Sequence, residues 1–296
     1  MTSIGPVSQP LSRSVDAIAD RSIFHSGGRT GFLLIHGLGG TPVELRFVAQ
    51  GLARAGYTVY CCQLAGHCST PDALRLSSAA QWCDSVEDAL GKLEKSCGTI
   101  IAGGLSMGAI LALDLAVKHP GRVHGLALFA PTLVLDGWSM PWRSRLLKYV
   151  RPTRWKSKIY LKEHPPYGIK DERIRAFIVN SMLSGDSGAA GVFSTPLHSL
   201  AEFNGLALKL KRRLGEIKAP TLILHPREDD MASLDNSIFI QRKLGGLVEL
   251  VVLDDSYHII TLDRQRHLVV DRTVAFAQSL EAQRAAQAAR VRNQRA

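Results

Sequence analysis

Three segments of the chain carry side chains that could act together in nucleophilic catalysis. The segment GLSMG places Ser106 midway between Gly104 and Gly108, and Asp229 and His258 follow much later in the chain. A serine hydroxyl is a weak nucleophile at neutral pH unless a base accepts its proton and a carboxylate holds that base in one tautomer. The order serine, acid, histidine is one of the known orders of such a triad. We therefore expect Ser106 as the nucleophile, His258 as its base and Asp229 as the residue that orients the base.

The surroundings of Ser106 are typical of a sharp turn between a strand and a helix. An apolar run at 99–103 precedes the serine, and a helical stretch at 109–118 follows it. Glycines two positions away on either side suit such a turn because larger side chains would clash there. The start of a helix also favours negative charge that develops beside it. An ordinary strand-to-helix turn is the alternative interpretation, and the presence of both possible partners argues against it.

Two adjacent carboxylates compete for the role of the acid. Asp229 and Asp230 lie in the loop after one predicted strand, and His258 lies in the loop after the next. Because the carboxyl ends of parallel strands meet at one edge of a sheet, both loops are expected near Ser106. We prefer Asp229 as the acid and keep Asp230 as the alternative.

Backbone amides are expected to bind the oxyanion that forms when a hydroxyl attacks a carbonyl group. The amide of Met107 directly follows the nucleophile, and the glycine-rich loop 36–40 offers a second donor, for which we choose Leu38. In measured cases one such donor stabilises the transition state by about 3 kcal/mol. A plain flexible turn is the alternative interpretation of the loop.

Short apolar runs alternate with helical stretches along most of the chain. Runs typical of buried parallel strands lie at 32–35, 57–62, 99–103, 123–129, 221–225 and 248–253. Helical stretches lie between the first two runs and at 79–93, 109–118 and 266–280. Each parallel connection needs a crossover, so the pattern predicts an α/β fold with a mostly parallel, doubly wound sheet.

Residues 131–218 interrupt this alternation. They predict a helical cap inserted over the carboxyl edge of the sheet, with helices at 171–183 and 200–214. The resulting division of the chain is an N-terminal lead-in (1–30), an α/β core (31–130 and 219–282), a basic helical cap (131–218) and an Arg-rich C-terminal tail (283–296).

The positive charge of the chain is regional. The formal net charge is +10, whereas residues 143–175 hold eleven Lys or Arg against three acidic residues, and residues 284–296 hold four Arg against none. A basic cap could dock an acidic carrier protein or an anionic lipid surface, and a merely solvated lid is the alternative. The charge comes with no recognised nucleic-acid module, so no specific nucleic-acid partner is expected.

We expect neither a secretion signal nor a membrane span in this chain. No apolar run approaches the roughly 20 residues that cross a bilayer, and the N-terminus lacks an apolar segment behind a basic start. The five cysteines lack metal-ligand spacing and are expected as reduced thiols. We expect a cytoplasmic enzyme without a metal or cofactor.

Several longer segments resemble the α/β-hydrolase superfamily, and more narrowly its bacterial carboxylesterase and monoacylglycerol lipase-like group. They are LLIHGLGGTPVELRFVAQGLARAGYTVY, GHCSTPDAL, GGLSMGAILALDLA, PTLILHPREDDMA and SYHIITLDRQR. The resemblance implies an α/β-hydrolase fold and places the same roles on Ser106, Asp229, His258 and the amides of Leu38 and Met107. The segment GHC departs from the pattern, because relatives usually have a glycine in place of its cysteine, and the cap matches least well.

The resulting expectation is a serine hydrolase that cleaves carboxylic esters, of the acyl or monoacylglycerol type, through an acyl-enzyme intermediate. Thioesterase or lysophospholipase activity is the first alternative, since a basic cap could bring an acidic carrier or an anionic lipid to the same chemistry. A non-catalytic binding protein that kept the fold is a minor alternative. Acyl chain length, leaving group and oligomeric state stay open.

Overall fold

A computed structural model describes residues 20–140, 159–162, 164–183 and 194–294 of the chain. Its main strands are β1 (Ile23–His25), β2 (Thr30–Ile35), β3 (Thr58–Cys62), β4 (Thr99–Leu105), β5 (Gly125–Phe129), β8 (Thr221–Pro226) and β9 (Val248–Leu253). These seven strands form one sheet in the order β1-β3-β2-β4-β5-β8-β9. All neighbouring pairs are parallel except β1 and β3.

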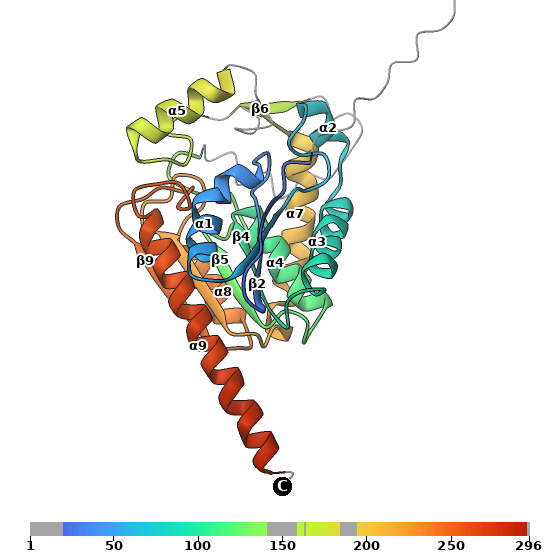
Figure 1. Cartoon of the computed structure of the whole chain (residues 1–296). Helices are drawn as coiled ribbons and strands as arrows, with labels where there is room; N and C mark the ends of the chain where they lie inside the picture. Colours follow the sequence, from blue (N-terminus) through green and yellow to red (C-terminus); the bar gives the residue numbers. More distant parts are fainter. Residues whose placement is uncertain (1–19, 141–158, 163, 184–193, 295–296) are drawn as a thin grey trace, which may run out of the picture.

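Helices cover both faces of this sheet (Figure 1). They are α1 (Arg46–Arg54), α2 (Pro71–Leu76), α3 (Ala79–Leu93), α4 (Met107–Lys118), α7 (Leu197–Lys211), α8 (Asp235–Lys243) and α9 (Arg266–Asn293), with the 3-10 turns η1 (Pro42–Leu45) and η4 (Leu214–Glu216). One buried cluster joins one sheet face to α3, α4, α7 and α8, and a second joins the other face to α1 and α9.

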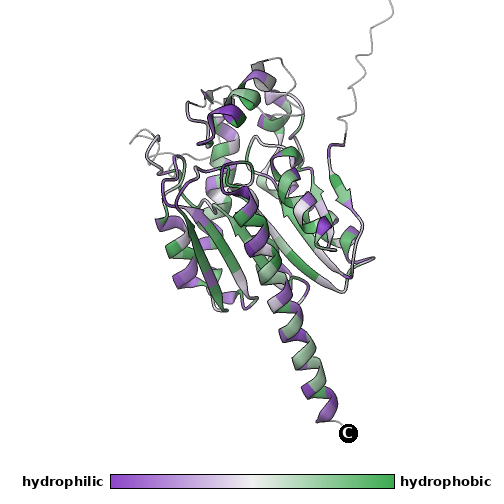
Figure 2. Cartoon of the chain, turned by 60° about the vertical axis from the view of Figure 1, so that its left-hand side comes forward, coloured by the Kyte–Doolittle hydropathy of each residue, from purple (hydrophilic) through white to green (hydrophobic). Residues whose placement is uncertain are grey.

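Successive side chains along a strand point to opposite faces of the sheet, so one strand contributes residues to both clusters. In β2, Leu33 and Ile35 belong to the first cluster, whereas Phe32 and Leu34 belong to the second. All four side chains are fully buried, as expected for a strand between two helical layers. In Figure 2, green marks hydrophobic residues, and it predominates on the central strands of the sheet. The predicted α/β fold with a mostly parallel, doubly wound sheet is therefore confirmed.

The predicted strands all occur, and the structure adds β1 at the edge. This three-residue strand pairs antiparallel with β3 and has no long apolar run of its own. The helix expected after loop 36–40 begins as the 3-10 turn η1, where the hydroxyl of Thr41 accepts a hydrogen bond from the amide of Val43. Short edge elements of this kind leave little periodic signal in a sequence.

The chain between β5 and β8 forms further elements above the carboxyl edge of the sheet. They are β6 (Tyr160–Lys162), α5 (Glu172–Leu183) and β7 (Ser194–Pro196), with β6 and β7 paired antiparallel. Helix α7 follows and packs against α3 and α4 in the core. Residues 143–158, which hold most of the charge predicted for the cap, lie outside the described residues. The proposed domain boundaries stay a prediction.

Helix α9 is longer than the sequence pattern indicated. The apolar face predicted an end near residue 280, but the helix continues to Asn293. Alanine, arginine and glutamine dominate the added turns, and these residues favour helix without needing a buried face. Residues 282–294 are exposed, and this end of the helix runs past the body of the molecule (Figure 1). The predicted end at 280 was wrong for this reason.

Candidate active site

Ser106 lies on a strained turn between β4 and α4. Its φ of 56° and ψ of −114° are unusual for a residue with a side chain. The structure also explains the two flanking glycines, because a Cβ atom added at Gly104 or Gly108 would collide with the carbonyl oxygen of Ile35. The turn is fixed by a hydrogen bond of 2.9 Å from the amide of Ser106 to the carbonyl oxygen of Phe129. This geometry lifts the serine hydroxyl above the edge of the sheet.

The hydroxyl of Ser106 has a partner that the sequence did not indicate. Its Oγ lies 3.1 Å from Oγ1 of Thr132, which also lies 3.1 Å from the carbonyl oxygen of Ala130. Because the single proton of the buried Thr132 hydroxyl is directed to that carbonyl, Ser106 is the donor to Thr132. Thr132 therefore orients the serine hydroxyl in this conformation.

His258 and Asp229 form a buried hydrogen-bonded pair. Nδ1 of His258 lies 2.8 Å from Oδ2 and 3.0 Å from Oδ1 of Asp229. An ionised carboxylate only accepts hydrogen bonds, so the imidazole proton lies on Nδ1 and Nε2 keeps its lone pair. Among the described residues, Nε2 of His258 is buried and has no hydrogen-bond partner. The geometry thus provides a nitrogen that could accept a proton.

Asp229 is held in place by the backbone that follows it. Its Oδ1 accepts hydrogen bonds of 2.8 Å from the amides of Met231 and Ala232. The buried ring of His225 lies beside it, with Nε2 at 2.9 Å from the carbonyl oxygen of Ala232 and Nδ1 at 2.8 Å from the hydroxyl of Ser237. These contacts therefore leave the carboxylate of Asp229 little freedom to rotate.

Buried charges shift the pKa values of this pair in opposite directions. Burial alone would lower the pKa of His258, but the charge and hydrogen bond of Asp229, with smaller contributions from Asp230 and Glu44, raise it above its ordinary value. Burial would raise the pKa of Asp229, but the charge and hydrogen bond of His258, together with His225 and the amide of Ala232, lower that pKa below its ordinary value. Asp229 is therefore ionised at neutral pH.

Asp230, the alternative acid, faces the backbone instead of the imidazole ring. Its Oδ2 accepts a hydrogen bond of 2.9 Å from the amide of Gly168, and its Oδ1 lies 3.3 Å from the amide of His258. Burial raises the pKa of Asp230. The geometry favours Asp229 over Asp230 as the partner of the ring.

The glycine-rich loop passes beside the serine. A Cβ built on Gly37 would lie 3.7 Å from the Cβ of Ser106, and Gly39 has a φ of 75° that suits glycine. The amide of Gly37 is bonded to the carboxylate of Glu44. Leu38, the next residue, is half-buried on this loop, and Met107 opens α4. The structure thus brings the loop and the helix start to the nucleophile.

Sequence reasoning missed three polar residues near the site. Thr132 contacts the serine, Glu44 bonds to the glycine-rich loop, and the buried Asp263 bonds to the residue before the histidine. Asp263 lies in a segment quoted above for its resemblance, but no local pattern singled it out. In the described part of the chain, no group of three or more His, Cys, Asp or Glu side chains could hold a metal ion.

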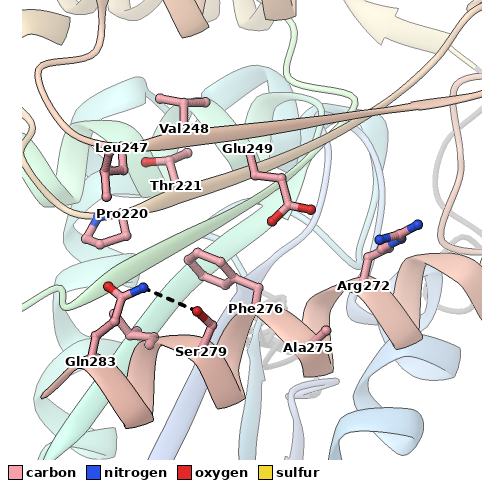
Figure 3. Close-up of a pocket in the computed structure, with 11 residues that line it drawn as sticks. Pro220, Thr221, Leu247, Val248, Glu249, Arg272, Ala275, Phe276, Ser279 and Gln283 are labelled. Carbon is pink, nitrogen blue, oxygen red and sulfur yellow. Dashed lines mark hydrogen bonds between the residues drawn. The ribbon is translucent and has the colours of Figure 1, made fainter. Parts of the chain in front are cut away.

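A cavity of about 290 Å³ lies elsewhere, between α9 and the first residues of β8 and β9 (Figure 3). Thr221 and Val248 line it at the amino ends of these strands, whereas Asp229 and His258 follow the carboxyl ends. A six-residue strand is about 20 Å long, so the cavity and the Asp229–His258 pair lie at opposite edges of the sheet. The cavity is not part of the site.

Comparisons with known proteins agree with this fold. The sequence profile of the family described as "Serine aminopeptidase, S33" matches residues 29–265. The chain is 29% identical to the thermostable monoacylglycerol lipase of Bacillus sp. (strain H-257), over 86% of this chain and 92% of that protein. It is 25% identical to a carboxylesterase of Bacillus subtilis (strain 168), over 86% of this chain and 95% of that protein.

A solved structure from work on LipS and LipT, two metagenome-derived lipolytic enzymes, superposes with a TM-score of 0.73. It shares 28% sequence identity with this chain, and the match covers 87% of this chain and 97% of the solved one. The overall fold of the chain therefore has a counterpart in a solved protein of similar size.

Proposed function

The chain belongs to the hydrolase family described as serine aminopeptidase, S33, and from that membership and the geometry of the site we propose that it cleaves carboxylic esters through an acyl-enzyme intermediate. The similar proteins named monoacylglycerol lipase and carboxylesterase support esters as the substrate class. An acyl ester or a monoacylglycerol is the proposed substrate. No metal or cofactor is needed for this chemistry.

In the proposed mechanism, the hydroxyl of Ser106 turns from Thr132 toward His258 and attacks the carbonyl carbon of the ester. Nε2 of His258 accepts the hydroxyl proton and then returns it to the leaving alcohol. Asp229 keeps the proton of the ring on Nδ1 and stabilises the imidazolium. Water then attacks the acyl-enzyme by the same proton transfers and releases the carboxylic acid.

The amides of Leu38 and Met107 are proposed to bind the oxyanion of each tetrahedral intermediate. Met107 is the first residue of α4, where the helix dipole also favours negative charge. Leu38 directly follows Gly37, at which an added Cβ would lie 3.7 Å from the Cβ of Ser106. Two such donors would be worth about 3 kcal/mol each to the transition state.

The observation that carries this proposal is the buried Asp229–His258 pair, which lies after the carboxyl ends of β8 and β9, at the edge of the sheet where the strained serine turn follows β4. A fluorophosphonate probe and a short-chain p-nitrophenyl ester test it together. We expect the wild type to be labelled and active, and Ser106→Ala to be unlabelled, with at most residual activity. Equal labelling of both proteins would overturn the assignment, and an unlabelled, inactive wild type would favour the non-catalytic binding protein. An aminoacyl anilide assayed in parallel separates ester from amide hydrolysis.

Thioesterase or lysophospholipase activity is the second candidate. The insertion exposes apolar side chains, with Phe177 at 72% and Trp138 at 59% exposure, and α5, which carries Phe177, also carries basic residues such as Arg173. A basic and apolar surface of this kind suits an acidic carrier or an anionic lipid. Rates on lysophospholipid, acyl thioester and neutral ester at increasing salt would separate the candidates, because only docking by charge weakens with salt.

The location in the cell is also proposed, as the cytoplasm. All five cysteines are free thiols, which fits a reducing compartment. Within the described residues, no helix combines the length and apolar character needed to span a bilayer. Fractionation of the producing cells tests the location directly.

A further inference from the structure

One buried carboxylate joins the insertion to the loop of the histidine. Asp263 is fully buried, and its two oxygens accept four backbone hydrogen bonds. Oδ2 accepts from the amides of Tyr257 at 2.7 Å and Lys170 at 2.8 Å, and Oδ1 accepts from the amides of Asp171 and Arg264 at 2.9 Å. Tyr257 directly precedes the histidine, whereas Lys170 and Asp171 belong to the segment between β5 and β8.

Two more contacts join the same parts of the chain. Asp230 accepts hydrogen bonds from the amides of Gly168 and His258 with its two oxygens, at 2.9 Å and 3.3 Å. The amide of Ile259 donates to the carbonyl oxygen of Gly168 at 2.7 Å. Consecutive residues 257, 258 and 259 are therefore each bonded, directly or through one carboxylate, to the segment 168–171.

We propose that Asp263 is a positioning residue for His258, and that the segment 168–171 of the insertion forms part of the support of this base. The proposal rests on the function proposed above, since it gives His258 a role that matters only if the histidine transfers protons. Asp263 itself touches neither the ring nor the serine; it acts through the backbone of Tyr257 and through the segment 168–171.

The physical reason is that a proton-transferring ring has to be held within a fraction of an ångström of its partner. A displacement of about 1 Å can cost on the order of 10²-fold in rate. The bond from Nδ1 to Asp229 sets the tilt of the ring, but it leaves the height of the backbone above the sheet edge unspecified. Asp263 and Asp230 fix that height, because each accepts hydrogen bonds both from the loop of the histidine and from the segment 168–171.

A purely structural role for Asp263 makes a different prediction. In that case its loss would lower the fraction of folded, active molecules, while each remaining active site would work at the normal rate. If Asp263 instead only shaped the substrate site through the insertion, KM would rise and kcat would be unchanged. The turnover number for each titrated active site separates these cases from positioning.

The test compares Asp263→Asn with Asp254→Asn in the full-length protein. Both changes remove one negative charge from the region that follows β9, but Asp254 is exposed and pairs with Arg227, which directly follows β8. Asparagine at 263 keeps the size of the side chain, but one of its two atoms becomes a donor facing backbone donors. Active sites are counted with a fluorophosphonate, and kcat and KM are measured on a p-nitrophenyl ester.

We expect kcat for each titrated site of Asp263→Asn to fall by roughly 10- to 100-fold, with KM within about twofold of the wild type. Asp254→Asn should keep the wild-type kcat. An unchanged kcat in folded Asp263→Asn, a rise in KM alone, or an equal fall in the control variant would each overturn the proposal.

A second variant changes the segment 168–171 of the insertion instead of Asp263. It tests the proposal if Asp263→Asn does not fold. Gly168 has a φ of 74°, and an added Cβ would lie 2.8 Å from Cγ1 of Ile259 and 3.3 Å from Cβ of His258. Gly168→Ala should therefore lower kcat by pressing on the histidine, and a normal kcat in this folded variant would overturn the proposal. Ester cleavage that survives in Ser106→Ala would instead overturn the proposed function.

Discussion

The two ends of β8 and β9 have different surroundings. The amino ends border a cavity, whereas the carboxyl ends lead into the residues of the candidate catalytic site. At the amino ends, the strands and α9 enclose a cavity of about 290 Å³ whose polar lining includes Glu249, Arg272 and Gln283 (Figure 3). At the carboxyl ends, Asp229 and His258 are buried and paired. The amino ends therefore border a cavity that is distant from the buried acid–base pair at the carboxyl ends.

Residues with a strained backbone conformation are also distributed differently between the candidate site and the cavity. In the described part of the chain, four residues other than glycine have a positive φ: Cys68, Ser106, Ala130 and Tyr167. Cys68 lies in the loop after β3, Ser106 and Ala130 directly follow β4 and β5, and Tyr167 directly precedes Gly168 in the insertion. Each such residue costs about 1–3 kcal/mol and persists only where its surroundings force it. The cavity at the amino ends is lined by no residue of this kind.

The largest effect should follow from changing the acid at the carboxyl edge. Asparagine at position 229 could donate to Nδ1 and would stabilise the wrong tautomer of His258, so Asp229→Asn should lower kcat by about 10⁴-fold. Asp230→Asn should cost less, since Asp230 contacts backbone amides and not the ring. Steady-state kinetics on one ester measure both. A larger loss in Asp230→Asn than in Asp229→Asn would reassign the acid.

The strained turn of the nucleophile gives the next prediction. A Cβ added at Gly108 would collide with the carbonyl oxygens of Ile35 and His36, so Gly108→Ala should destabilise the fold by about 1–3 kcal/mol. Gly91 in α3 is the matched control, because an added Cβ there meets nothing within 4 Å. Gly91→Ala should stabilise the protein by about 0.5–1 kcal/mol, as expected for a helix interior. Thermal unfolding of both variants measures the two opposite shifts in Tm, and a stable Gly108→Ala protein would contradict the steric argument.

The sequence predicted the serine turn, the loops of Asp229 and His258 and the strands, because each depends on a local pattern. Glycines around a serine and apolar runs of strand length are visible within a few residues. Thr132, Glu44 and Asp263 could not be found this way, since each has a hydrogen-bond partner seven or more residues away in the chain. Single polar residues in loops have no periodicity, so only the folded chain reveals what they contact.

A smaller effect is expected from Glu44, which lies between the glycine-rich loop and the histidine. Asp229, Asp230 and Glu44 carry the negative charges that raise the pKa of His258. The proposed mechanism requires neutral His258, so kcat/KM should increase as the pH rises through this pKa. Glu44→Gln removes one of the raising charges and keeps an acceptor for the amide of Gly37. The pKa of His258 should then fall, and the acidic limb of the pH profile should move to lower pH.

The control for this shift is Glu87→Gln. Glu87 lies on α3 and pairs with Lys118, so its change removes the same charge without a role at the site. Profiles of kcat/KM against pH for the three proteins give the comparison. An acidic limb that moves to higher pH in Glu44→Gln, or that moves equally in Glu87→Gln, would contradict the electrostatic explanation.

The smallest effect should come from the cavity at the amino ends of β8 and β9. Ala275 is an exposed residue of α9 that lines it, and Figure 3 shows Ala275 on the side of the helix that faces the strands. Ala275→Trp should partly fill the cavity and leave kcat/KM within about twofold of the wild type, because surface changes away from a site rarely matter. If this folded variant lost activity on long-chain esters while keeping activity on short ones, the cavity would have to be part of the substrate path, and the contrast between the two strand ends would fail.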